Sequence, residues 1–213
     1  MKRVIFLLVI AIGALTNVYA QIEASKVQSF VTQSPEEYKV LADRFVNADT
    51  TLTLDELSMI YYGAPFCKDF TFGKYDAQLD ELYNNASSVE QYDVVGLVAQ
   101  RALNENPTSF DLLVKAIVGV KNGSDKAAQE QLDNLRTRYT MIFKAISASG
   151  SGVTPEAPCY VTSQNDKLKY LSHAYGVVEV LEECEISNCV AVKVNYLSGE
   201  EMKEAIIYVK MVK

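Results

Sequence analysis

Side chains of the kinds that usually perform catalysis are sparse in this sequence. His173 is the only histidine, which excludes a metal site or a proton relay built from several histidines. A Ser-His-acid triad needs one histidine, but no G-x-S-x-G elbow occurs to present a serine nucleophile. His173 also lies in a helix-like stretch, where a surface or half-buried role is the ordinary one. A hydrolase that assembles serine, His173 and an acid only in space is therefore kept as the alternative function.

The acidic residues show no spacing typical of a ligand site. The sequence has no calcium loop, no H-E-x-x-H pair and no glycine-rich phosphate loop. Acid pairs such as Asp55-Glu56 and Asp80-Glu81 are sequence neighbours, so their side chains point apart on a helix. We interpret these acids as solvated charge and expect neither a metal nor a cofactor.

The sequence contains four cysteines: Cys67, Cys159, Cys184 and Cys189. Four cysteines allow three pairings, and an exported protein favours disulfides. Cys184 and Cys189 flank a short separator between two strand-like runs, so a hairpin could bring them together. We predict this bridge and, because it leaves two cysteines, a second bridge between Cys67 and Cys159. The C-x4-C spacing differs from the C-x-x-C of thiol redox centres, so a structural role is favoured.

An aromatic segment stands out between residues 61 and 75, where glycine and proline make the chain irregular. Aromatic rings beside irregular backbone can line a binding cleft, because they offer large contact area with few rotatable bonds. They can equally be a loop held by its own core, and this alternative is favoured because the chain has no tryptophan and tyrosine must do its packing. The candidate binding residues are Tyr61, Tyr62, Phe66, Phe70, Phe72 and Tyr75.

The first twenty residues have the pattern of a secretory signal peptide. Lys2 and Arg3 are followed by an apolar stretch over 4–15, which is shorter than the ~20 residues that span a bilayer. Cleavage between Ala20 and Gln21 is predicted. No cysteine lies near this point to carry a lipid, so we expect a free periplasmic or secreted protein that is not a lipoprotein.

The remaining chain, residues 21–213, is acidic. Its formal net charge changes from −7 to −9 when Lys2 and Arg3 are removed. An acidic surface repels phosphate backbones and anionic headgroups, so nucleic acid is excluded as a partner and no membrane insertion is expected after cleavage. A protein or peptide partner remains possible, and the oligomeric state is left open.

Apolar residues recur three or four apart across 21–149, which predicts a helical domain. Helix starts are expected at Ser34-Pro35, at Thr53 and at Ser124-Asp125, the last opening one helix that continues to about Ile146. The step from Ala102 to Pro107 between two helices resembles a degenerate tetratricopeptide unit. Because a single unit cannot form a solenoid, a compact bundle is predicted.

Composition changes at the small, polar stretch 147–152, which marks the one predicted boundary. Beyond it, residues 150–213 contain a strand-like Cys159–Thr162, a short helix over 166–175, and three runs rich in Val, Ile and Tyr over 176–181, 190–197 and 205–211. The sequence predicts an α+β fold: a helical bundle with tetratricopeptide-like hairpins, followed by a small antiparallel β-meander packed on it.

Several short motifs carry a family resemblance. Tyr61-Tyr62-Gly63, the Ala102…Pro107 step, the run 152–157 and Gln21 after the cleavage point resemble an uncharacterised exported family of Bacteroidota, a domain of unknown function. The chain departs from that pattern by carrying Cys67 and Cys159. The resemblance implies a cell-envelope setting and a helical-plus-β fold, and it implies no activity. The function we expect is a non-catalytic exported envelope protein that binds a protein or peptide.

Overall fold

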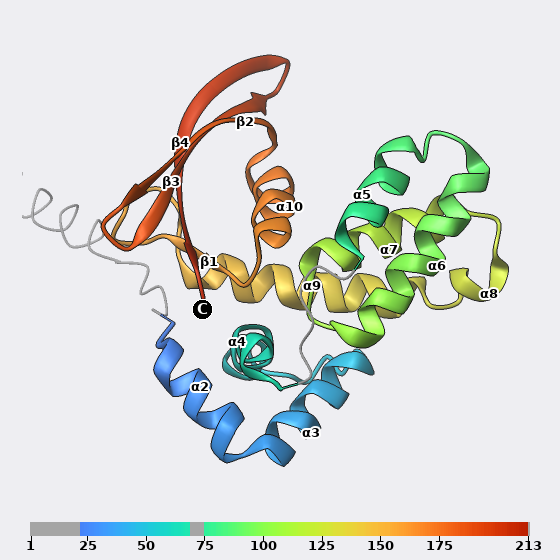
Figure 1. The fold of residues 1–213 in the computed structure, drawn as a ribbon, viewed down its shortest axis with the longest axis horizontal. Helices are drawn as coiled ribbons and strands as arrows, with labels where there is room; N and C mark the ends of the chain where they lie inside the picture. Colours follow the sequence, from blue (N-terminus) through green and yellow to red (C-terminus); the bar gives the residue numbers. More distant parts are fainter. Residues whose placement is uncertain (1–21, 69–74, 213) are drawn as a thin grey trace, which may run out of the picture.

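The computed structural model describes residues 22–68 and 75–212 of the 213-residue chain. The predicted signal peptide and the cleavage point between Ala20 and Gln21 lie outside the described residues, as do Phe70 and Phe72. Figure 1 shows helices first along the chain and a four-stranded sheet last, which confirms the α+β prediction.

Three helices and one short turn open the described chain: α2 (Ala24–Gln33), α3 (Pro35–Val46), α4 (Leu54–Gly63) and the 3₁₀ turn η1 (Ala64–Phe66). Helix α4 starts at Thr53, as the sequence predicts, and the structure shows a capping box there: the Thr53 hydroxyl accepts from the Glu56 N–H while the Glu56 carboxylate accepts from the Thr53 N–H. The start of α3 differs from the prediction: Pro35 is at its first turn, but the Ser34 side chain caps nothing. Helix α2 was not predicted at all.

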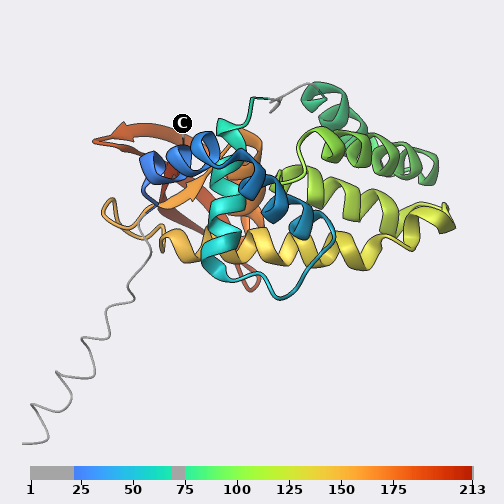
Figure 2. The same ribbon diagram turned by 90° about the horizontal axis from the view of Figure 1, so that it is seen from below.

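The next five helices are α5 (Asp76–Asn85), α6 (Val89–Glu105), α7 (Phe110–Asn122), α8 (Lys126–Gln129) and α9 (Leu132–Ser149). Helix α9 crosses the middle of the molecule and contacts α4, α7 and strand β1 of the sheet (Figures 1 and 2). The single helix predicted from Ser124-Asp125 to Ile146 was wrong, since a turn after Gln129 divides it. The short α8 is therefore free to lie away from the axis of α9.

The sheet is mixed. Its strands are β1 (Cys159–Val161), β2 (Val177–Ile186), β3 (Cys189–Ser198) and β4 (Glu201–Met211), in the order β1-β4-β3-β2. The predicted antiparallel meander is confirmed in β2, β3 and β4, whereas β1 adds to β4 in parallel. Among the strands of the described residues, β2 lies at an edge and pairs only with β3.

Helix α10 (Gln164–Tyr175) covers one face of this sheet. Gly176, with φ of +68°, takes the left-handed conformation that ends α10 and sends the chain into β2. The covered face carries the buried apolar side chains Val192, Val194, Ile207 and Val209. Alternation along each strand places them on one side.

One hydrophobic core serves the helices and the sheet. It joins Phe45, Ile60 and Ile142 from the helices to Val192 and Val209 from the sheet. Helix α9 ends at Ser149, beside the predicted boundary, yet the core continues across it. The helical part and the sheet therefore pack as one body around α9.

Candidate functional site

Tyr61 and Tyr62 are fully buried, so they present no surface to a ligand. The Tyr61 hydroxyl donates to the Asp166 carboxylate at 2.9 Å, and the Tyr62 hydroxyl donates to the carbonyl of Tyr160 at 3.1 Å. Burial raises the pKa of Tyr61 well above its usual value. For these two residues the structure favours the core alternative over the cleft, and both tie α4 to the C-terminal part of the chain.

The other members of the aromatic segment are dispersed. Phe66 and Tyr75 are half-buried and pack against the core, and the Tyr75 hydroxyl donates to Glu105 at 3.2 Å. Phe70 and Phe72 lie outside the described residues. The described aromatics thus support the packing of α4, η1 and α5.

Neither predicted disulfide is present in the structure. Cys184 lies opposite Ala191, and Cys189 lies opposite Ile186, so the two thiols are two residues out of register across the hairpin. Cys159 is buried, with its Sγ 3.0 Å from the Tyr175 hydroxyl and 3.4 Å from the Gly150 carbonyl oxygen. Cys67 instead faces the Gly63 carbonyl, 3.9 Å away, at the end of η1.

His173 lies on α10 with its Nδ1 3.0 Å from the Tyr139 hydroxyl. Its ring also packs edge-on against Phe110, with centroids 5.9 Å apart. Burial, followed by the nearby charge of Lys169, lowers its pKa. Among residues 22–68 and 75–212, neither a serine nor a carboxylate forms a hydrogen bond or ion pair with this ring. The structure does not assemble the proposed triad around His173.

A carboxylate at the centre of the molecule fastens α10 to α4 and α7. Asp166 accepts from four donors within 3.2 Å: the Asp111 N–H and the hydroxyls of Ser109, Tyr61 and Thr162. Asp166 is 1% exposed. Because every donor comes from the protein itself, this group is satisfied without a ligand. We call these five residues the Asp166 junction.

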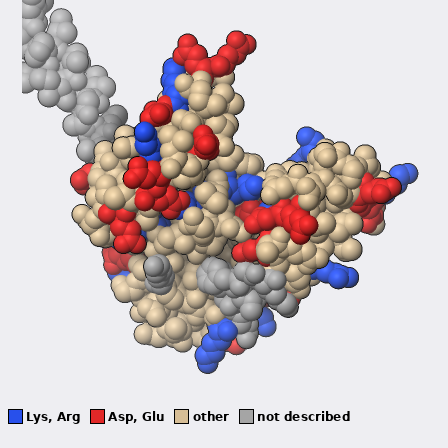
Figure 3. All heavy atoms as spheres, turned by 45° about the horizontal axis from the view of Figure 1, so that its top comes forward, with Lys and Arg blue, Asp and Glu red and all other residues tan. Residues whose placement is uncertain are grey.

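A charged cluster adjoins this junction, between α5, α7 and α10. Lys115 Nζ lies 2.7 Å from Asp111 Oδ2 and also contacts Asp80. Burial alone would lower the pKa of Lys115, but the two carboxylates raise it. Lys169 lies 4.5 Å above the Tyr83 ring. The two carboxylates thus keep Lys115 protonated, which suits an ion pair and not a nucleophile. Burial instead lowers the pKa of Lys169. Figure 3 shows basic side chains near the centre of one face, with acidic side chains on either side.

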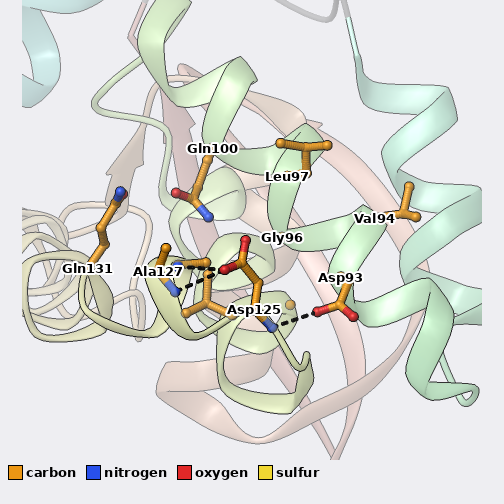
Figure 4. Close-up of a pocket in the computed structure, with 11 residues that line it drawn as sticks. Asp93, Val94, Gly96, Leu97, Gln100, Asp125, Ala127 and Gln131 are labelled. Atoms are coloured by element: carbon orange, nitrogen blue, oxygen red, sulfur yellow. Dashed lines mark hydrogen bonds between the residues drawn. The ribbon is translucent and has the colours of Figure 1, made fainter.

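A pocket of about 370 Å³ opens between α6, α7 and α8, at the end of the helical part (Figure 4). This volume lies in the range of small-ligand and side-chain sites. Its floor consists of small or apolar residues, and Leu97 and Val94 on α6 remain 55% and 42% exposed at its side. The lining residues are Asp93, Val94, Gly96, Leu97, Gln100, Gly119, Val120, Asp125, Ala127, Ala128 and Gln131.

Two glycines set the floor of the pocket. A Cβ on Gly119 would lie within 3.0 Å of the α6 backbone at three atoms, and a Cβ on Gly96 would lie 3.2 Å from the carbonyl carbon of Gly119. The backbones of α6 and α7 can approach each other this closely only because neither position carries a side chain. The two closely packed helix backbones therefore form the floor of the pocket at Gly96 and Gly119.

Two acids hold the rim of the pocket. Asp93 on α6 accepts from the Ser124 N–H at 2.6 Å and the Ser124 hydroxyl at 2.7 Å. Asp125 caps α8 by accepting from the N–H groups of Ala127 and Ala128 through Oδ1. Hydrogen bonds from Ser124 lower the pKa of Asp93, so it is ionised at neutral pH. Figure 4 shows the Asp125 carboxylate among the labelled lining residues, facing Gly96 and Gln100.

One part of this pocket is visible in the sequence: Ser124-Asp125 predicts a helix start, and Asp125 caps α8. The available signal for the rest was the occurrence of Gly96 and Gly119 inside two apolar helices, because glycine within a helix costs about 1 kcal/mol against alanine and usually has a packing reason. That the two glycines face each other was decided by the tertiary structure.

The described residues show two further absences. No group of three or more His, Cys, Asp or Glu side chains in 22–68 and 75–212 is arranged to hold a metal ion. No helix in the same ranges is both long and apolar enough to cross a membrane.

Comparison with protein families gives one match. A family model described as a domain of unknown function (DUF4919) matches residues 24–205, which include α2 through β3 and the first part of β4. No curated protein and no solved structure matches the chain.

Proposed function

Since the chain belongs to the DUF4919 family, whose description assigns no activity, we propose a function from its own geometry: a non-catalytic exported protein that binds a peptide segment of a protein partner in the α6–α8 pocket. The observation that carries this proposal is the pocket itself. It combines an open floor of small residues with two exposed apolar side chains, and a hollow of this kind accepts a partner's side chain.

The charge of the pocket points to the kind of segment. Both charged residues in its lining, Asp93 and Asp125, are acidic. A lysine or arginine side chain suits this combination, since its methylene stem can lie on Leu97 while its charged end meets a carboxylate. The formal net charge of −7 on the chain also favours approach of a basic partner.

The export half of the proposal rests on Lys2, Arg3, the apolar stretch 4–15 and Ala20. N-terminal sequencing of protein recovered outside the cytoplasm is expected to begin at Gln21. A soluble cytoplasmic pool that retains Met1 would contradict export.

Peptide display tests the binding half. A random peptide library is panned on the immobilised protein, and selected peptides are measured against Leu97→Gln and against Val40→Gln as a matched control. Val40 is 60% exposed on α3, away from the pocket. We expect Leu97→Gln to weaken binding ~10-fold, equivalent to ~1.4 kcal/mol, and the control to bind as wild type does. Equal binding by Leu97→Gln, or a library that yields no binder, contradicts the proposal.

A charge variant tests the choice of segment. Asparagine caps helices as well as aspartate, so Asp125→Asn removes charge and keeps α8 capped. Asp133→Asn on α9 is the matched control, because its side chain is 98% exposed and lies outside the pocket lining. Selected peptides should carry Lys or Arg and lose affinity only with Asp125→Asn. If the selected peptides bind without a basic residue, the pocket is still the binding site, but the preference for a basic segment is refuted.

A further inference from the structure

The pairing of β2 with β3 changes register along the hairpin. At the base, Val177 lies opposite Tyr196; in the middle, Val180 lies opposite Val194; near the tip, Glu183 lies opposite Val192. The register moves by one residue between Val177 and Glu179 and by one more between Val180 and Glu182. Two β-bulges on β2 therefore offset the pairing register at the tip of the hairpin by two residues from the register at its base.

The base register, continued without bulges, brings two cysteines together. Seven residues beyond Val177 is Cys184, and seven residues back from Tyr196 is Cys189. In the present tip register the two are diagonal neighbours on one face, since Cys184 lies opposite Ala191. Diagonal neighbours are about 7–8 Å apart, whereas a disulfide needs Cα atoms closer than about 7 Å. The bulges are thus what separates the two thiols.

We propose that Cys184 and Cys189 form a disulfide when both bulges move into the turn, so that the hairpin has two registers: a thiol register with the two-residue turn Ser187-Asn188, and a disulfide register with a four-residue loop over 185–188. The disulfide predicted from the sequence belongs to the second register and the structure shows the first. The proposal is independent of the α6–α8 pocket.

The position of β2 permits this change. It is an edge strand paired only with β3, so no second ladder must break when it slides. Its base stays fixed, because Val177 keeps its partner in both registers and follows directly from α10 through Gly176. Ser187 now has a φ of +55°, a left-handed conformation that a residue with a side chain rarely adopts, and a wider loop relieves it.

The change also exchanges one apolar residue for another on the covered face. Val180 now pairs with Val194 on that face, while Leu181 is 41% exposed. In the unbulged register Leu181 lies opposite Val192, whose side chain is fully buried. Glu179 moves to the covered face, and its hydrogen bond from Asn195, now 2.9 Å, is lost. The Glu183 carboxylate, now 2.6 Å from Lys167 Nζ, also shifts from opposite Val192 to opposite Val190. These losses make the thiol register the more stable one while both thiols are reduced, and the covalent bond has to offset them in the disulfide register.

The oxidation is ordinary thiol–disulfide exchange with a small disulfide such as oxidised glutathione. The thiolate of exposed Cys184 attacks one glutathione sulfur and releases the other as a thiolate, leaving a mixed disulfide. The Cys189 thiolate then attacks the Cys184 sulfur, forms the protein disulfide and releases the second glutathione thiolate. Two protein thiols are oxidised and one glutathione disulfide is reduced to two thiols, with both protons passing to the released glutathiones.

The test treats the full chain with oxidised glutathione, maps disulfides by non-reducing peptide analysis and compares NMR contacts before and after. A double variant, Cys184→Ser with Ile186→Cys, is the control, because it places a cysteine opposite Cys189 in the present register. We expect wild type to lose two reactive thiols to a Cys184–Cys189 bond, to lose the contact between residues 186 and 189 across the turn, and to gain one between Leu181 and Val192. The control should close while keeping the Val180–Val194 contact.

Two results would overturn the proposal. One is a wild type that leaves both thiols reduced in conditions that close the control. The other is a Cys184–Cys189 bond that forms while Val180 still lies opposite Val194. Cys184→Ala and Cys189→Ala should each abolish the gain of the Leu181–Val192 contact, although Cys189→Ala can still carry glutathione as a mixed disulfide on Cys184. A Leu181–Val192 contact that still appears in either variant would assign the register change to another cause.

Discussion

The Asp166 junction and the α6–α8 pocket both use aspartates that accept backbone N–H groups, with opposite results. At the junction, Asp166 is 1% exposed and four donors of the protein surround it. At the pocket, Asp93 and Asp125 fix a turn and a short helix beside a hollow that stays open. The hydrogen bonds are of the same kind in both places, and the neighbouring side chains make the difference. Large side chains around Asp166 fill the core, whereas glycine and alanine beside Asp93 and Asp125 leave a pocket.

The largest expected effect is on the junction side of this comparison. Tyr62→Ala removes a fully buried ring beside Tyr61 and should lower the free energy of unfolding by ~3–5 kcal/mol. Urea denaturation measures this change. Tyr62→Phe is the matched control, since it keeps the ring and removes only the hydroxyl that reaches Tyr160. A loss below about 1 kcal/mol for Tyr62→Ala would mean that the ring is not core.

The next effect concerns the floor of the pocket. Gly119→Ala would place a Cβ against the α6 backbone at Gly96, so the helices must separate. We expect the free energy of unfolding to fall by ~1–3 kcal/mol, although alanine is the better helix former by about 1 kcal/mol. Thermal unfolding tests the sign. A more stable Gly119→Ala protein would show that α6 and α7 do not touch there.

A smaller effect is the pH dependence of the rim. Hydrogen bonds from Ser124 lower the pKa of Asp93 in the folded protein, so its ionised form stabilises the fold above the unfolded pKa of about 3.9. This contribution is lost as the pH falls through the lowered folded value. Comparison of wild type with Asp93→Asn at pH 7 and at successively lower pH should give a stability difference that shrinks in acid. A stability difference that stays constant with pH would show that the ionised Asp93 carboxylate does not stabilise the turn at Ser124.

The smallest effect sharpens the contrast between core and opening. Leu97 is 55% exposed, so Leu97→Gln should change the free energy of unfolding by less than about 0.5 kcal/mol. Chemical denaturation of Leu97→Gln and of Tyr62→Ala under the same conditions compares the two changes in the free energy of unfolding. A strongly destabilised Leu97→Gln would place this side chain in the core and remove it from the pocket.

The local sequence determined many of the elements, because their signals act between near neighbours. Thr53 and Glu56 specify the start of α4 through hydrogen bonds only three residues apart. Alternating apolar residues in 190–197 specify β3 in the same way, since one face of a strand is buried and the other is wet. The break after Gln129 had no such signal: the sequence Ala127-Ala128-Gln129-Glu130-Gln131 contains good helix formers throughout, and nothing local divides it.

Periodicity and residue counts are properties of the chain, so they were enough to predict the α+β class and the meander and to exclude a site built from several histidines. The tertiary structure alone decided that Tyr61 and Tyr62 are core, that Gly96 meets Gly119 beneath α8, and that Cys184 lies opposite Ala191 instead of Cys189. Each of these depends on a register set by two bulges or on surfaces that pack together across 23 residues of chain, from Gly96 to Gly119, up to 105 residues, from Tyr61 to Asp166. The spacing of residues along the sequence does not indicate these contacts, because they depend on how the whole chain packs.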